Sequence, residues 1–62
     1  MKNLRKIREM LGLTQADLAK RSGLTPAAIS NFEAGTREPS LSSVIAILKA
    51  IPVKFEKLVG LE

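Results

Sequence analysis

The sequence predicts an all-α fold, a compact bundle of five short helices. Apolar residues recur three and four positions apart along most of the chain, the spacing of a helix with one buried face. Thr14, Thr25 and Ser40 are residue types that favour helix N-caps, and each stands just before such a segment. Gly23 and Gly35 follow the second and third segments, where a left-handed residue commonly ends a helix. The start and stop signals therefore agree with the apolar pattern.

Length and composition indicate a single domain over residues 1–62, with no room for a second hydrophobic core. The chain contains two Phe and neither Trp nor Tyr, so its core must be built from aliphatic side chains. It contains no cysteine and no histidine. We therefore expect no disulfide, no metal site and no cofactor.

The charge favours an anionic partner without deciding its identity. The formal net charge is +4 and the isoelectric point is about 10, but many small proteins carry such a charge for solubility alone. The longest uninterrupted apolar run spans only residues 44–48, too short for a membrane span. No signal-peptide pattern fits the N-terminus, because lysines and arginines interrupt it. We expect a cytoplasmic protein without a membrane segment.

The first helix is predicted to begin after Asn3, its N-cap, and to end at Gly12. Arg8 lies beside its apolar face, an unusual position for a charge. Glu33 borders the core face of the third helix in the same way, so the two residues are natural partners. We expect Arg8 and Glu33 to form a structural ion pair rather than a catalytic one.

The second and third helices begin with similar signals. Thr14 is the predicted N-cap of the second helix, and Asp17 follows three residues later, near the positive end of the helix dipole. Thr25 is the predicted N-cap of the third helix, and Pro26 occupies its first position, where the missing N–H costs nothing. Only Gly23 and Leu24 separate the two helices, so the connection is expected to be a tight corner.

A fourth helix is predicted after Ser40 and ends before Pro52, and a short fifth helix follows it. The apolar arc of the fourth helix comprises Leu41, Val44, Ile47, Leu48 and Ile51. The expected core takes apolar residues from all five helices: Leu4, Ile7, Leu11, Leu18, Leu24, Ile29, Phe32, Leu41, Val44, Leu48, Ile51 and Leu58.

Nearly the whole chain resembles the Cro/phage-repressor (XRE-like) class of helix-turn-helix proteins. The residues that carry the resemblance are Gln15, Ala19, Gly23, Ile29-Ser30, Phe32-Glu33, Gly35 and Pro39-Ser40. The resemblance implies a lambda-repressor-like DNA-binding domain with the helix-turn-helix at helices two and three. It also implies sequence-specific binding of double-stranded DNA by a small transcriptional regulator, a repressor being expected.

The resemblance implies a set of DNA-binding residues. The third helix, about residues 25–34, would enter the major groove, and Gln15 would hold a phosphate at the start of the second helix. Asn31 would either bond adenine at two edges or hold a phosphate. Arg37 would bind a phosphate or a narrow minor groove, with a solvated turn arginine as the equal alternative. The full expected set is Gln15, Thr25, Pro26, Ala27, Ser30, Asn31 and Arg37.

The sequence departs from the family at Pro26 and Ala27, where relatives often carry Gln, Arg or Ser. Few long polar side chains therefore reach the groove. Ala27 offers only a methyl group, which suits the methyl group of thymine.

A homodimer on a two-fold symmetric site is expected, because one recognition helix covers only a few base pairs. The apolar residues that remain after the core is filled form the expected dimer interface: Ile45, Phe55, Val59 and Leu61.

Catalysis is not expected, because the acidic residues show no paired spacing and no Gly-rich phosphate loop is present. The alternative function is a protein-binding adaptor or antitoxin-type helix-turn-helix module, with weak or no DNA binding. The short side chains of the third helix keep this alternative open.

Overall fold

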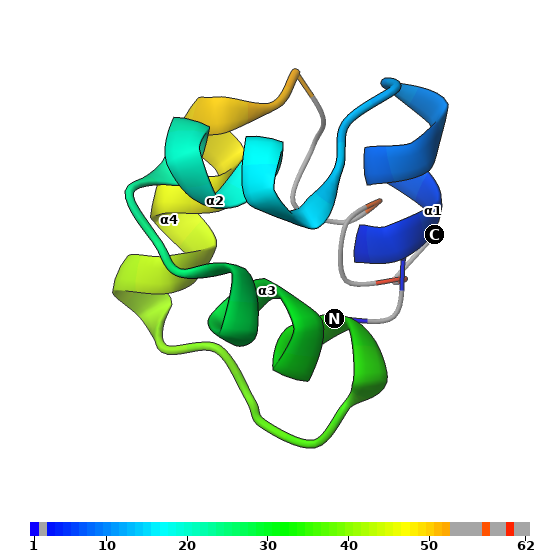
Figure 1. Ribbon diagram of the computed structural model, residues 1–62. Coiled ribbons are helices and arrows are strands. Elements are labelled where there is room, and N and C mark those ends of the chain that lie inside the picture. The colour runs from blue at the N-terminus through cyan, green and yellow to red at the C-terminus, as the bar shows by residue number, and fades with distance from the viewer. Residues whose placement is uncertain (2, 53–56, 58–59, 61–62) are drawn as a thin grey trace.

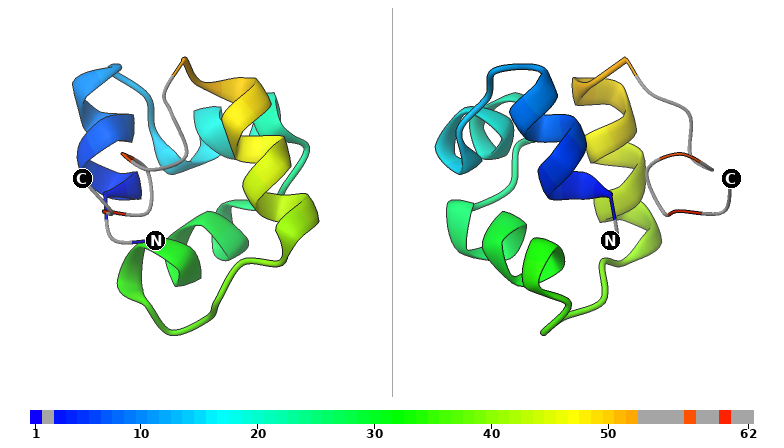
Figure 2. Two further views of the ribbon diagram at one scale, coloured as in Figure 1. Left: turned by 180° about the vertical axis from the view of Figure 1, so that it is seen from behind. Right: turned by 90° about the vertical axis from the view of Figure 1, so that its right-hand side faces the viewer.

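The computed structural model describes residues 1, 3–52, 57 and 60. This part of the chain contains four helices: α1 (Leu4–Met10), α2 (Gln15–Ser22), α3 (Pro26–Ala34) and α4 (Leu41–Ala50). α2 packs against both α3 and α4, and α1 packs against α3 (Figure 1 and Figure 2). The prediction of an all-helical fold is confirmed for the described residues. The expected fifth helix lies largely outside them, so the count of five is not confirmed.

The helix starts follow the predicted caps. The Thr14 hydroxyl accepts the Asp17 N–H at 3.0 Å and the Asp17 carboxylate accepts the Thr14 N–H at 2.9 Å, which completes a capping box. The Thr25 hydroxyl caps α3 by accepting the Ala28 N–H at 3.1 Å. The Ser40 hydroxyl caps α4 in the same way. These local hydrogen bonds fix where α2, α3 and α4 begin.

The prediction that the Asn3 side chain caps α1 is wrong. Asn3 occupies the N-cap position, but its side chain makes no capping hydrogen bond. Its φ and ψ of −106° and 5° are not the extended values typical of a capping residue. The side-chain amide instead donates to the Lys57 carbonyl oxygen at 2.7 Å.

Glycines in the left-handed conformation end the two central helices. Gly23 closes α2 with φ of 73° and donates its N–H to the Ala19 carbonyl. Gly35 closes α3 with φ of 76° and donates to the Asn31 carbonyl. A side chain at either position would be strained at this φ, so both glycines are required by backbone geometry.

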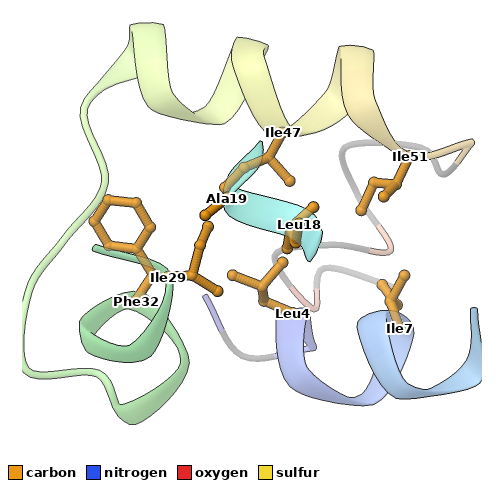
Figure 3. Close-up of a cluster of buried hydrophobic side chains, with 8 residues drawn as sticks. All are labelled: Leu4, Ile7, Leu18, Ala19, Ile29, Phe32, Ile47 and Ile51. Carbon is orange, nitrogen blue, oxygen red and sulfur yellow. The ribbon is translucent and has the colours of Figure 1, made fainter. Parts of the chain in front are cut away.

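The core lies where the four helices converge (Figure 3). Ala19 is buried on α2, and its methyl group leaves room for a close helix crossing. Leu24 and Leu48 are only half-buried, but both pack against the cluster. The buried apolar residues are Leu4, Ile7, Leu18, Ala19, Ile29, Phe32, Val44, Ile47 and Ile51.

The assignment of Leu11 and Leu41 to the core is wrong. Leu11 is 42% exposed: it is the C-cap of α1 and still donates its N–H to the Ile7 carbonyl, but the other helices leave its side chain partly uncovered. Leu41 is 75% exposed. On α4 the core covers the stripe of Val44, Ile47 and Ile51, and Leu41 lies on the neighbouring stripe, four residues before Ile45. Ile47, which the expected core omitted, is fully buried, and Leu58 lies outside the described residues.

Candidate nucleic-acid interface

Helix α3 has one buried and one exposed face, as its spacing predicts. Ile29 and Phe32 anchor it in the core. Pro26, Ala27 and Ser30 are exposed on the opposite side. The outer face of α3 therefore carries short side chains that leave the helix backbone open to a close approach.

The two remaining α3 candidates are partly committed to bonds within the protein. Thr25 is exposed, and its hydroxyl oxygen already caps the helix. Asn31 is half-buried, and its side-chain Oδ1 accepts a hydrogen bond from the Thr36 hydroxyl at 3.2 Å. This bond orients the Asn31 amide with its N–H group as the available donor. Pairing with both N6 and N7 of adenine also needs Oδ1, which would have to accept the adenine N6–H with its second lone pair.

Gln15 is the first residue of α2 and is half-buried. Its side-chain Nε2 donates to Glu33 Oε1 at 3.1 Å. The backbone N–H groups of Gln15 and Ala16 precede the first bond of the α2 ladder, from the Leu18 N–H to the Thr14 carbonyl. The end of α2 therefore offers free donors beside an amide that is already oriented.

The structure brings Arg8 and Glu33 together. Arg8 Nε donates to Glu33 Oε2 at 2.6 Å, and Arg8 Nη2 donates to Glu33 Oε1 at 3.1 Å. Arg8 Nη1 donates to the Leu13 carbonyl oxygen at 2.7 Å. The two side chains are only 10% and 5% exposed. This bidentate pair joins α1 to α3, and its bond to Leu13 holds the segment that enters α2.

The pair shifts both pKa values in the direction that keeps both groups charged. Burial raises the pKa of Glu33, but the hydrogen bonds from Arg8 and Gln15 and the Arg8 charge leave the pKa below its ordinary value. The hydrogen bond to Glu33 raises the pKa of Arg8 against the effect of burial. Glu33 therefore stays an acceptor at neutral pH.

The sequence did not predict the Gln15–Glu33 bond, although it singled out both residues. The sequence also did not single out Arg5, which lines a surface groove between α1, α2 and α3. Its spacing to Glu9 is that of an ordinary exposed pair, and the two side chains do form one at 3.7 Å. The groove is lined by Arg5, Arg8, Gln15, Ser30, Glu33 and Ala34.

The other expected contact residues lie away from this groove or outside the residues that the structure describes. Arg37 is exposed in the loop between α3 and α4. Ile45 is 44% exposed on α4, whereas Phe55, Val59 and Leu61 lie outside the described residues. No helix in the described ranges is long and apolar enough to cross a membrane. Within the same ranges, no cluster of three or more acidic, cysteine or histidine residues is arranged to hold a metal ion.

Comparisons with known proteins give consistent similarities. A family model described as helix-turn-helix matches residues 4–58. An uncharacterised HTH-type transcriptional regulator of Sinorhizobium fredii is 41% identical over 51 residues, covering 82% of this chain and 26% of the relative. A second uncharacterised HTH-type transcriptional regulator, from Methanocaldococcus jannaschii, is 41% identical over 59 residues, covering 94% of this chain and 89% of the relative. Antitoxin HipB of Escherichia coli is 40% identical over 45 residues, covering 73% of this chain and 48% of the relative.

These relatives differ in length. The match with the Sinorhizobium fredii regulator spans about a quarter of that protein, and the match with the antitoxin spans about half of it. No solved structure matches the chain significantly.

Proposed function

Because this chain belongs to the helix-turn-helix family, we propose that it binds double-stranded DNA in a sequence-specific way, as a small transcriptional regulator of the repressor type. Residues 1–62 act as a single DNA-binding domain. α3 enters the major groove, and the protein acts by binding rather than by catalysis. It works in the cytoplasm, in contact with the DNA it regulates.

The observation that carries the proposal is that α3 has one face buried in the core and the other face exposed. Ile29 and Phe32 hold the helix in the core, while Pro26, Ala27 and Ser30 face outward. A helix held in this way has the width that fits the major groove, and its short side chains let the backbone approach the bases.

The contacts divide into two classes. Gln15 and Arg37 bind phosphates and set affinity and register. Ala27 and Asn31 contact base edges, Ala27 through its methyl group and Asn31 through the amide N–H that Thr36 leaves free. Thr25, Pro26 and Ser30 complete the surface that meets the DNA.

The names of the relatives support this proposal. Two of the three are called transcriptional regulators, and the relative from Methanocaldococcus jannaschii has nearly the length of this chain. The antitoxin name of the third belongs to that protein, and it agrees equally with a module that binds DNA and with one that binds protein.

The protein acts as a homodimer on a two-fold symmetric site. Its longest extent is 27 Å, whereas half-sites one helical turn apart are separated by about 34 Å. One copy is therefore too short to read both half-sites. Ile45 and Leu41, exposed together on α4, provide an apolar face for the second copy, with Phe55, Val59 and Leu61 as the other proposed interface residues.

The test is a fluorescence titration against mixed genomic duplex fragments across a salt series. DNA binding through phosphates makes the logarithm of the binding constant fall linearly with the logarithm of salt concentration. Arg37→Ala should reduce that slope by about one unit per protomer. Lys49→Ala, which removes an exposed cation from α4, is the matched control and should change the slope much less. An adaptor with no DNA surface would give no steep salt dependence.

Sedimentation tests the dimer separately. We expect two protomers per bound duplex at saturation. One protomer per duplex would rule the dimer out while leaving DNA binding intact.

A further inference from the structure

We propose that Arg5, Gln15 and Ser30 form one phosphate-binding site, to which α1, α2 and α3 contribute one side chain each. The inference rests on the proposed DNA binding and adds Arg5 to it. Its ligand is a single phosphodiester group of the DNA backbone, beside the DNA major groove that α3 is proposed to enter.

The three side chains line the same surface groove. Arg5 comes from the first turn of α1, Gln15 from the first position of α2 and Ser30 from the middle of α3. They are 10 and 15 residues apart in sequence, so only the packing of the three helices brings them together. Ser30 also lies on the outer face of α3, so this groove adjoins the surface proposed to meet the bases.

The buried pair below the groove leaves it without a free negative charge from Glu33. Both Glu33 oxygens accept hydrogen bonds from Arg8, and Oε1 also accepts from Gln15. The Arg8 and Glu33 charges cancel, and Arg5 is the remaining charge among the residues that line the groove. The groove therefore suits an anion.

Gln15 is oriented before any ligand arrives. Its Nε2 is held by Glu33, which fixes the amide and spares it the entropy of ordering on binding. The second N–H of that amide and the backbone N–H groups at the start of α2 remain as donors. These donors bind neutral and charged acceptors alike, and the partial positive charge of the helix end favours an anion.

Arg5 supplies the charge. Its side chain is 71% exposed, so it can swing toward a phosphate at little cost. Its present partner is Glu9, itself 57% exposed, at 3.7 Å. An exposed pair at this distance is weak and is not a hydrogen bond, whereas a phosphate offers the guanidinium two parallel hydrogen bonds. We therefore expect phosphate to displace Glu9.

The first experiment measures binding of a fixed duplex by the full chain and by Arg5→Ala, with Lys49→Ala as the matched loss of one cation. Arg5→Ala should weaken binding about tenfold at low salt and reduce the salt slope by about one unit per protomer. Lys49→Ala should weaken it less than about twofold. Equal effects of the two variants would overturn the site.

The second experiment combines Arg5→Ala with Gln15→Ala. Two side chains that hold the same phosphate should couple, so the double variant should lose less affinity than the product of the single losses. Losses that multiply would overturn the shared site.

The third experiment uses Glu9→Gln, which removes the competitor for Arg5. Binding should tighten about twofold to fivefold, the scale of one exposed ion pair. The matched control is the same substitution in the Arg5→Ala background, where the gain should vanish. A gain that persists there would contradict the displacement of Glu9 by phosphate.

These outcomes separate from failure of the proposed function. If the unchanged protein binds no duplex at low salt, DNA binding and this site fall together. If it binds duplex and Arg5→Ala loses no more affinity than Lys49→Ala, only the proposed phosphate site is refuted and DNA binding stands. Thermal unfolding of Arg5→Ala should match the unchanged protein within a few degrees, because the residue is exposed.

Discussion

Removing one member of the Arg8–Glu33 pair should destabilise this domain far more than replacing both. In Arg8→Ala, Glu33 keeps a carboxylate that is only 5% exposed and loses two hydrogen bonds at 2.6 and 3.1 Å. The Leu13 carbonyl also loses its donor. Stranding a buried charge in this way costs about 3–5 kcal/mol. That is a large part of the roughly 5–15 kcal/mol by which native domains are stable.

The assay is urea unfolding at neutral pH followed by circular dichroism, with thermal melts in parallel. Each kcal/mol should lower the melting temperature by about 4–8 °C in a domain of this size. Arg8→Ala and Glu33→Ala should therefore melt more than about 12 °C below the unchanged protein. The double variant Arg8→Met/Glu33→Leu should be more stable than either single variant, since it leaves no buried charge unpaired.

Arg5→Ala is the matched control, because Arg5 also sits on α1 in an ion pair, but in an exposed one. It should cost less than about 1 kcal/mol. Single Arg8 and Glu33 variants that unfold as easily as Arg5→Ala would refute the reasoning. So would a double-mutant cycle without coupling between the two positions.

Three further predictions concern the core, pH and the α4 surface. Ile29→Ala should cost about 2–5 kcal/mol, because Ile29 is fully buried; a melting temperature within a few degrees of the parent would contradict this core. The pKa of Glu33 is lowered on folding, so its contribution to stability is present above its unfolded pKa of about 4.3 and is lost as pH falls through the folded value. Stability measured from pH 7 down to pH 3 should fall more steeply for the unchanged protein than for Glu33→Gln, and parallel curves would contradict the assignment. Leu41→Ser should change the free energy of unfolding by less than about 0.5 kcal/mol at concentrations where the chain is monomeric, whereas a core position would cost several times more.

The features that could be predicted from the sequence are those decided within one turn of chain. The hydroxyl of Thr14 caps residues just beyond it, and Gly23 must adopt a left-handed conformation wherever a helix turns back so sharply. The side chain and the backbone groups it serves are neighbours in sequence, so residue type and spacing carry the information. Asn3 shows the limit of such local prediction, because its side-chain amide donates to the Lys57 carbonyl, 54 residues away, instead of capping α1.

The features that could not be predicted depend on which surface the other helices cover. The apolar arc of α4 is wider than the core, and only packing decides that Ile47 is buried while Leu41 is exposed. The candidate site shows the same limit. The position of Gln15 at a helix start can be predicted, but its hydrogen bond to Glu33 joins residues 18 positions apart. In the sequence, Arg5 has the spacing of an ordinary exposed pair with Glu9, and only the packed structure shows that it lines the groove.

The central claim is that α3 reads the sequence of double-stranded DNA, and binding-site selection from a random duplex library tests it most directly. We predict an enriched sequence with two related half-sites about 10 base pairs apart, in two-fold symmetry. Asn31→Ala, selected in parallel, should lose part of that base preference, and its affinity for the selected site should fall by about 1–3 kcal/mol. A library that emerges with no enriched sequence, although the protein binds duplex, would contradict the claim. Identical preferences for the two proteins would show that Asn31 holds only the backbone.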